Sequence, residues 1–381
     1  MTNRSAYILA VTVCLLVALG VTMLCSTSVF GADARADDLY YEVKRQVMWI
    51  VLGVAGCILM AAVDYRVWQR TTWIWYGLAI IALALCFIPG IGVERNGETR
   101  WINLGFTQVQ PSEFAKLAAV MVLAWWFARH VHEEKKFFRG FVFPGLIVGV
   151  LALLILFEVD MGTTLVIGAA AFTLMFVAGS RIWYLIGSGM VAATALGFMI
   201  RMIPNRWDRI IALTDLEKYQ RGVGMQQYRS VLAFGSGGID GMGLGNGLFK
   251  MLYLPFAHTD FIFPMVGEEL GLGFTLAVVL AFVLIVVCGL SIALHAPDRF
   301  GQLLGIGIVC LIAFQGLLNI GVTTAVLPNT GLPLPFVSYG GSNLVACLLG
   351  VGILLNIYRQ GNHREHENFP RIMRNKVTPR L

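Results

Sequence analysis

The chain has 381 residues, of which 57% are hydrophobic and only 13% are charged, and its formal net charge is +6. A water-soluble domain has about 25% charged residues, so this composition excludes a soluble globular protein and indicates a surface that faces lipid. At about 20 residues for each transmembrane helix, the length allows roughly ten spans with their loops and no soluble domain of ordinary size.

The first apolar run, Ala6 to Cys25, follows a short head that contains Arg4. A cleaved signal peptide has a shorter apolar region and an A-x-A-like exit, and neither is present here. We therefore expect Ala6 to Cys25 to be an uncleaved first span.

Further apolar segments are long enough to cross a bilayer. They are Gln46 to Val63, Trp73 to Pro89, Phe114 to Phe127 with its flanks, Phe141 to Leu156, Thr163 to Ala178, Ile182 to Ile203, Phe261 or Leu270 to Leu294, Leu303 to Val322, and Leu344 to Ile357. The sequence thus predicts an all-α integral membrane protein of about ten transmembrane helices, organised as a single polytopic domain over residues 1–381.

The orientation follows from the short loops, because Lys and Arg accumulate on the cytoplasmic side. A cytoplasmic N-terminus places most of the basic loop residues inside: Arg66, Arg70, Arg129, Lys135, Lys136, Arg139, Arg181 and Arg299. The basic tail, residues 359–381, lies on the same side, where we expect it to contact anionic lipid and not nucleic acid. Both termini are therefore predicted to be cytoplasmic.

Four segments remain on the extracytoplasmic side: Ile91 to Ser112, Phe157 to Gly162, Pro204 to about Asp260, and Leu327 to Ser342. The large loop between spans 7 and 8, residues 204–260, is longer than about 15 residues, and loops of such length are usually either functional or disordered. Its aromatic residues argue against disorder. We expect it to fold back onto the membrane, partly as an interfacial helix.

The large loop is rich in glycine from Gly235 to Gly247, which permits positive φ angles and close backbone approach. A nucleotide-binding fold is not expected, because no strand and helix frame these glycines. A tight re-entrant turn is the favoured interpretation. Upstream arginines, Arg206 among them, are either ligands of an anionic lipid or headgroup contacts.

Ionisable residues cluster where the eighth span begins. His258, Thr259 and Asp260 precede an aromatic run, and Glu268 and Glu269 follow it. An ionisable group at membrane depth is costly and is a functional candidate by default. Two interpretations stay open: Thr259 or Asp260 merely caps the helix while the glutamates lie among headgroups, or these residues form a site.

A second cluster flanks the fourth predicted span. Arg100 lies in the preceding outer segment, and Glu113 and Lys116 are three residues apart, so they share one face of a helix. Glu113 and Lys116 either neutralise each other near the interface, or Arg100 and Lys116 hold a phosphate.

The last outer segment, Leu327 to Ser342, contains several prolines and glycines that prevent a regular helix. Non-helical backbone at this depth is tolerated only against protein or a wet cavity. We expect the segment to line a groove, with Ser338, Tyr339 and Ser342 as candidate binding residues. Glu158 and Asp160 add acids at the same face.

The cysteines and histidines give no metal-binding pattern. The seven cysteines lie in apolar runs, and no C-x-x-C or H-E-x-x-H spacing occurs. The cysteines are expected to be buried small hydrophobes. No metal site is predicted, and a divalent cation (Mg²⁺ or Mn²⁺) is left open as a cofactor.

The motifs of the outer segments together resemble one family. They are N-G-x-x-R-W-I-N-L-G, Q-P-S-E-x-A-K, the D-x-G-T turn, G-S-G-G-x-x-G-x-G-L-G, H-T-D-F-I-F with G-E-E-L-G, and L-P-L-P-F-x-S-Y-G-G-S. In this order and on one membrane face, they resemble the SEDS family of bacterial shape, elongation, division and sporulation glycosyltransferases. The run from Tyr40 to Trp49 and G-E-E-L-G are more similar to the division member than to the elongation member.

The resemblance implies polymerisation of lipid II into glycan strands during septal wall synthesis. It implies a class B penicillin-binding protein as partner, together with divisome proteins, in the bacterial inner membrane. It also assigns the catalytic role to Asp260, the aspartate of H-T-D-F. A lipid II flippase, an elongation-type polymerase and a recruiting scaffold are the alternatives.

The chain departs from the family pattern at three places. Arg229 stands where the family usually has Gln, and Pro264 replaces a small residue after H-T-D-F-I-F. Glu158 and Val159 stand where Gln-Pro or Glu-Pro is usual. We expect these changes to alter the local loop geometry more than the chemistry.

Overall fold

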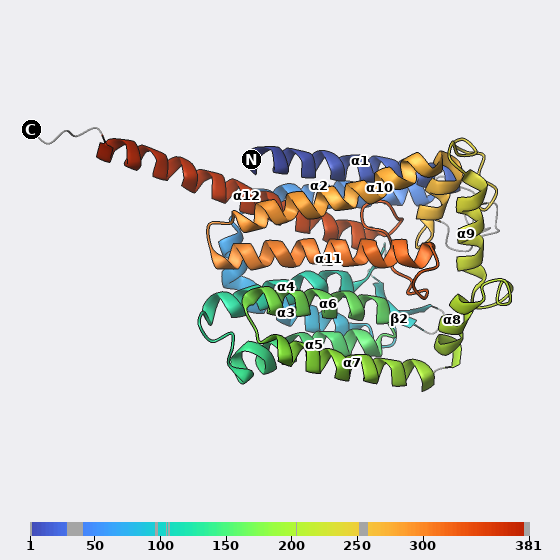
Figure 1. Cartoon of the computed structure of the whole chain (residues 1–381), viewed down its shortest axis with the longest axis horizontal. Coiled ribbons are helices and arrows are strands. Elements are labelled where there is room, and N and C mark those ends of the chain that lie inside the picture. The colour runs from blue at the N-terminus through green and yellow to red at the C-terminus, as the bar shows by residue number, and fades with distance from the viewer. Residues whose placement is uncertain are drawn as a thin grey trace, which may run out of the picture.

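Long, nearly parallel helices form one bundle in the computed structural model, which describes residues 2–28, 41–95, 98–103, 105, 107–202, 204–250 and 258–376 (Figure 1). The long helices are α1 Thr2–Ser28, α2 Tyr41–Ala62, α3 Tyr65–Leu85, α4 Pro111–Arg129, α5 Phe143–Phe157, α6 Met161–Ala178, α7 Ile182–Met202, α10 Ile262–Leu294, α11 Arg299–Thr323 and α12 Gly341–Lys376. A short π-helix, η1 (Phe138–Val142), leads into α5.

The apolar runs of the sequence are the cause of this architecture. In lipid every backbone N–H and C=O must be satisfied within its own segment, and a helix does this. Eight of the helices in the described residues are long and apolar enough to cross a membrane. α3 and α4 contact each other, and α4 also packs on α6, α11 and α12. With these two the bundle has the ten long helices that were predicted.

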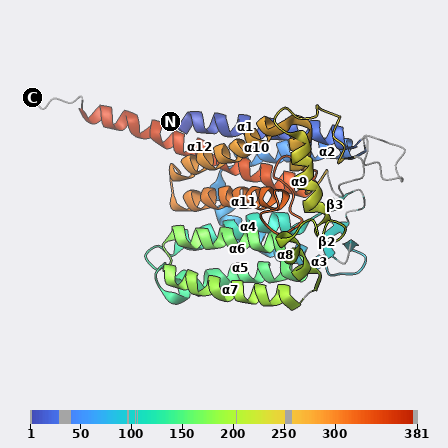
Figure 2. The same ribbon diagram turned by 45° about the vertical axis from the view of Figure 1, so that its right-hand side comes forward.

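The two ends of the bundle differ. α1 begins and α12 ends at one end, whereas α8 (Pro204–Thr214) and α9 (Met225–Gly237) lie at the other (Figures 1 and 2). α9 lies across the direction of the long helices (Figure 1). The large loop thus forms helices, and the four outer segments gather at this end, here called the outer end. That one of these helices lies at the membrane interface stays a prediction.

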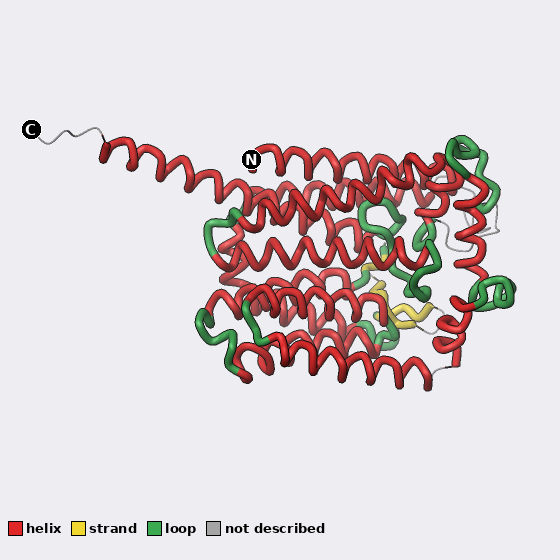
Figure 3. Tube along the Cα trace, in the orientation of Figure 1, coloured by secondary structure: helices red, strands yellow, loops and turns green. Residues whose placement is uncertain are grey.

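A small sheet at the outer end was not predicted, so the all-α expectation needs this correction. β1 (Gly92–Arg95), β2 (Glu98–Asn103) and β3 (Gln108–Val109) form an antiparallel sheet in the order β1-β2-β3 (Figure 3). The pairing of Arg95 with Glu98 leaves a two-residue connection, Asn96-Gly97, between the strands. Asn-Gly is a strong hairpin signal, because both residues tolerate positive φ.

The glycine-rich loop packs directly against a break in α10. Gly271 has φ +76° and ψ −173°, and it interrupts the helix. The N–H groups of Met242 and Gly243 donate to the carbonyls of Glu268 and Glu269, at 2.9 and 3.0 Å. The positive φ angles expected from the glycines are present at Gly238, Gly241, Gly243 and Gly245.

Two glycines of α9 give a matched test of this packing. A Cβ on Gly237 would lie 2.1 Å from the carbonyl oxygen of Gly267, whereas a Cβ on Gly235 would meet no atom within 4 Å. We expect Gly237→Ala to destabilise the protein by about 1–3 kcal/mol through overpacking against backbone. Gly235→Ala should be neutral or stabilise by up to about 1 kcal/mol. Thermal unfolding in detergent measures both, and equal midpoints would contradict the close packing.

Candidate active site at the outer end

The segment between α11 and α12, residues 324–340, lies beside Asp260 and is here called the floor segment. It has no helix, as predicted, and Gly331 and Phe336 both have φ +67°. Leu332, Leu334 and Phe336 bury their side chains beneath it. The Ser338 hydroxyl accepts a hydrogen bond from the Leu334 N–H at 2.8 Å, which closes the turn. Ser338 therefore holds the shape of the segment.

Asp260 lies half-buried just before α10. The helix begins at Ile262, its N-cap residue is Phe261, and no side chain caps it. Thr259 and Asp260 thus precede the N-cap position, and the choice between a capping role and a site stays a prediction. A Cβ on Gly331 would lie 3.6 Å from Asp260 Oδ2, so the carboxylate is next to the floor segment.

His258 and Thr259, both half-buried, lead the chain into this position. The backbone N–H of Tyr339 donates to the carbonyl of His258 at 3.0 Å, and the two rings meet edge to face at 5.9 Å. His258 Nε2 lies 3.5 Å from a carboxylate oxygen of Glu42 on α2. The structure thus brings His258, Asp260, Ser338 and Tyr339 together, although they come from two different segments.

Arg100 on β2 reaches the turn between α5 and α6. It donates to the carbonyl of Val159 at 2.8 Å and lies 3.9 Å from Asp160, while only 9% of its surface is exposed. Val159 has φ +68°, an unfavourable angle for a β-branched residue. Proline could not adopt this angle. That Glu158 and Val159 change the loop geometry relative to the family pattern stays a prediction.

Asp160 and Ser342 join this turn to α4 and α12. Asp160 accepts hydrogen bonds from Thr163, through its N–H at 3.0 Å and its hydroxyl at 2.8 Å, and from the Gln110 side chain at 3.2 Å. The Gln110 backbone N–H donates to the Ser342 hydroxyl at 2.9 Å. Arg100, Asp160 and Ser342 therefore belong to one connected polar network.

Glu158, in the same turn, is fully buried, and burial raises its pKa from 4.5 to about 8. At a pH between 4.5 and about 8, Glu158 keeps its proton in the folded protein and releases it in the unfolded chain. The free energy of unfolding should therefore fall as pH rises, by about 1.4 kcal/mol per pH unit. Glutamine does not titrate, so the stability of Glu158→Gln should not have this pH dependence. We therefore expect the thermal midpoint of Glu158→Gln to rise relative to that of wild type from pH 5 to pH 7.5.

Glu133 gives the control for that titration. Hydrogen bonds from Arg139 and Lys136 lower its pKa to about 2, so it is ionised in both states across this range. Glu133→Gln should therefore shift the thermal midpoint equally at every pH above 5. A Glu158→Gln curve parallel to wild type would show that Glu158 is ionised when folded.

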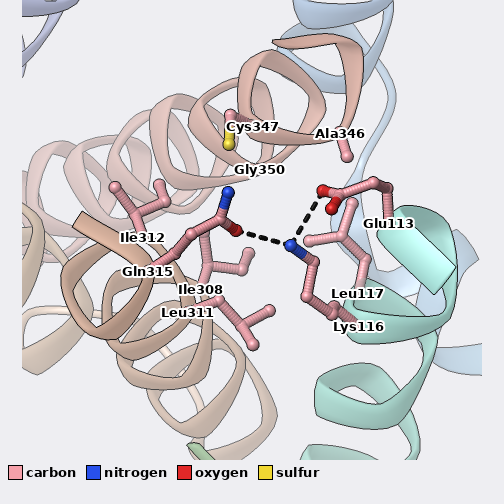
Figure 4. Close-up of a pocket in the computed structure, with 10 residues that line it drawn as sticks. All are labelled: Glu113, Lys116, Leu117, Ile308, Leu311, Ile312, Gln315, Ala346, Cys347 and Gly350. Carbon is pink, nitrogen blue, oxygen red and sulfur yellow. Dashed lines mark hydrogen bonds and ion pairs between the residues drawn. The ribbon is translucent and has the colours of Figure 1, made fainter. Parts of the chain in front are cut away.

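Glu113 and Lys116 lie deeper in the bundle, beside a small pocket between α4, α11 and α12 (Figure 4). Lys116 Nζ is 2.8 Å from Glu113 and donates to the side-chain oxygen of Gln315 at 2.5 Å. Asn343 donates to Glu113 at 2.8 Å. The lysine charge is thus already offset by Glu113, as the neutralised-pair interpretation has it. A role for either residue in substrate binding stays a prediction.

Glu268 and Glu269 are buried and turned toward the glycine-rich loop. Glu268 accepts from the N–H groups of Leu248 and Phe249, at 2.5 and 3.2 Å. Glu269 is bonded to the hydroxyl of Ser26 and to Lys250 Nζ, both at 2.7 Å. Contacts within the chain therefore occupy Glu269 and one oxygen of Glu268, whereas Glu268 Oε2 is buried without a hydrogen bond to the described residues. Substrate binding by the two residues stays a prediction.

Sequence reasoning missed several residues of this region. Lys250, Gln315 and Asn319 were not predicted, although a Lys, a Gln and an Asn within apolar or glycine-rich stretches are detectable as costly groups at membrane depth. Arg209 on α8 donates to the carbonyl of Asn329 at 3.4 Å, which brings a loop arginine to the floor segment. The side chain of Arg206 lies outside the described residues.

No metal site is formed by protein side chains within the part of the chain that the structure describes. No three His, Cys, Asp or Glu residues there come together as ligands. The residues present do not by themselves fit a divalent cation, so no chemical step is assigned to one.

Comparison with known proteins identifies the family. The profile of the FtsW/RodA/SpoVE family, described as "Cell cycle protein", matches residues 6–363. The chain belongs to this family. It is 40% identical over 343 residues to the "Probable peptidoglycan glycosyltransferase FtsW" of Geobacter metallireducens, covering 89% of this chain and 90% of the relative. It is 38% identical over 358 residues to the stage V sporulation protein E of Bacillus subtilis, covering 93% and 97%.

Solved structures of the family share the fold. One, described as "Structural coordination of polymerization and crosslinking by a peptidoglycan synthase complex", aligns with a TM-score of 0.74 and 27% identity over 93% of this chain and 97% of that chain. The rod shape determining protein RodA of Thermus thermophilus aligns with a TM-score of 0.68 and 27% identity over 92% and 95%. These findings confirm the resemblance to the SEDS family that the motifs indicated.

Proposed function

We propose that this chain is a peptidoglycan glycosyltransferase that polymerises lipid II into glycan strands, with Asp260 as the general base. Family membership and the names of its relatives support the activity. The observation that carries the assignment of the base is the position of Asp260. It is half-buried at the outer end, and its carboxylate lies next to the irregular floor segment at Gly331.

The chemistry requires a base near the acceptor sugar. The carboxylate of Asp260 takes the proton of the acceptor 4-hydroxyl as that oxygen attacks the anomeric carbon of a lipid-linked donor. The bond between the anomeric carbon and the diphosphate oxygen breaks, and the lipid diphosphate leaves. Because the donor is lipid-linked, its diphosphate lies at the level of the headgroups, near the outer end of the bundle.

The negative charge of the leaving diphosphate must be offset by positive charge. The cations near the floor segment differ in how far an acid already neutralises them and in their exposure. Lys116 is paired with Glu113 at 2.8 Å, whereas Arg100 lies 3.9 Å from Asp160 and makes its short hydrogen bond to a neutral carbonyl. Arg209 is exposed beside Asn329. Of these three cations only Arg209 is exposed, so Arg209 is the one that we expect to offset the charge of the diphosphate.

The partner and the location follow from the same proposal. A class B penicillin-binding protein crosslinks the strands that this chain makes, and the relative described as part of a peptidoglycan synthase complex supports such an assembly. The outer end faces outward from the bacterial inner membrane, and the relatives named FtsW favour a place at the division septum with divisome proteins.

The test is polymerisation of lipid II by the purified chain with its penicillin-binding protein. Glycan strands resolved on a denaturing gel are expected with the chain present and not without it. Transfer of labelled lipid II across vesicles without polymer would instead indicate a flippase. Polymer formed equally fast without the chain would indicate a scaffold. Either result would refute the proposal.

A further inference from the structure

Two buried amides on α11 face the floor segment. Gln315 and Asn319 are four residues apart, so they lie on one face of the helix, and their exposed fractions are 2% and 1%. Residues this polar are costly within a membrane bundle unless their hydrogen bonds are met. Their bonding partners therefore indicate what they are for.

Asn319 joins Asp260 to the floor segment. Its side-chain Nδ2 donates to the backbone carbonyl of Asp260 at 2.8 Å and to that of Leu332 at 2.7 Å. Both partners are carbonyl oxygens, which only accept, so the NH₂ side of the amide must face them. One amide group thus sets the separation of two segments that are distant in sequence, and Gly331, next to Leu332, is the residue beside the Asp260 carboxylate.

Gln315 extends the connection inward. Its Nε2 donates to the carbonyl of Pro333 at 2.9 Å, and its side-chain oxygen accepts from Lys116 Nζ at 2.5 Å. Consecutive carbonyls of the floor, those of Leu332 and Pro333, are therefore held by consecutive turns of α11. Lys116 and Glu113 in turn fix the orientation of the Gln315 amide.

We propose that Asn319 is a positioning residue for Asp260, and that Gln315, oriented by Lys116, supports it through the floor segment. The inference rests on the proposed function, because it concerns the base of that reaction. Asn319 does not touch the reacting atoms. It holds the backbone of Asp260 against the floor, so that the carboxylate meets the acceptor hydroxyl in one place.

The test is Asn319→Asp, which keeps the size of the side chain but replaces two N–H donors with oxygen. A carboxylate would face two carbonyl oxygens, and the Asp260 backbone should shift away. A displacement of this kind can cost on the order of 10²-fold in rate. We expect kcat for lipid II polymerisation to fall by that order while KM changes less than about threefold. Asn319→Gln, which keeps both donors, should retain more turnover than Asn319→Asp.

Asn356 on α12 provides a matched control at the opposite end of the bundle. It is fully buried, and its Nδ2 also donates to two backbone carbonyls, those of Ala61 at 2.8 Å and Val63 at 2.7 Å. Asn356→Asp makes the same chemical change far from the floor segment. We expect it to lower the thermal midpoint as Asn319→Asp does, but to leave kcat of the folded protein unchanged.

A double-mutant cycle separates positioning from a general loss of structure. If Asn319 acts through Asp260, then Asp260→Asn with Asn319→Asp should be no slower than Asp260→Asn alone. Wild-type kcat in Asn319→Asp, an equal loss in Asn356→Asp, or a fully additive double variant would each overturn the inference while the proposed function stands. A wild-type protein that makes no polymer would refute the proposed function, and the inference would fall with it.

Discussion

Asp260→Asn should lower the initial rate of glycan polymerisation by about 10²–10⁴-fold, the usual contribution of a general base. Asparagine has nearly the same shape as aspartate but cannot take the proton of the acceptor hydroxyl. Asp260 is only half-buried and lies before the N-cap position of α10, so the thermal midpoint should stay close to that of wild type. The measurement is the rate of lipid II consumption by the purified protein with its partner.

The control for this variant is Asp240→Asn. Asp240 is an exposed acid in the glycine-rich loop, three residues after the end of α9. The substitution removes the same charge without removing the proposed base, so the rate should remain within about twofold of wild type. If Asp260→Asn polymerised lipid II as fast as wild type, Asp260 would not be the base. If both variants lost activity equally, surface charge would explain the loss.

Lys250→Met should be the most destabilising change predicted for this chain. Lys250 and Glu269 form an ion pair at 2.7 Å with both side chains fully buried, and Lys250 also bonds the hydroxyl of Ser26 on α1 at 2.8 Å. Methionine keeps the apolar stem but leaves Glu269 charged and buried without its lysine. Breaking such a pair costs about 3–5 kcal/mol. At about 2–4 °C for each kcal/mol, the thermal midpoint in detergent should fall on the order of 10 °C.

A double variant and a surface ion pair test whether loss of the Lys250–Glu269 ion pair causes the loss of stability. Lys250→Met combined with Glu269→Gln removes the uncompensated charge, so it should recover most of the lost stability. Lys136→Met removes the lysine of a pair with Glu133 in which the lysine side chain is 64% exposed, and it should shift the midpoint little. A double variant as unstable as Lys250→Met would indicate that lost packing, and not charge, is responsible.

The membrane spans could be predicted because the rule that produces them is local. A run of apolar residues must form a helix in lipid whatever lies beside it. The outer segments could be located for the same reason, because they are the segments that connect the predicted spans. The irregular floor segment followed from its prolines and glycines, which act on their own backbone.

The partners of the polar residues could not be predicted, because they depend on how the helices pack. The partners of Glu268 and Glu269, which include the Leu248 N–H and Lys250 Nζ, are an example. Ser26 meets Lys250 and Glu269 only because α1 packs on α10. Apolar residues cover the spans on all sides, so the sequence pattern does not say which faces meet.

The sequence by itself therefore determined the class of protein, the course of its spans, the motifs of its family and the aspartate proposed as base. Only the tertiary structure decided that Asn319 holds that aspartate, that Gln315 connects the floor to Lys116, and that Lys250 neutralises Glu269. The physical reason is the separation along the chain over which each effect acts. Hydrophobic length acts within one segment, whereas a buried hydrogen bond needs two segments brought to within about 3 Å of each other by packing.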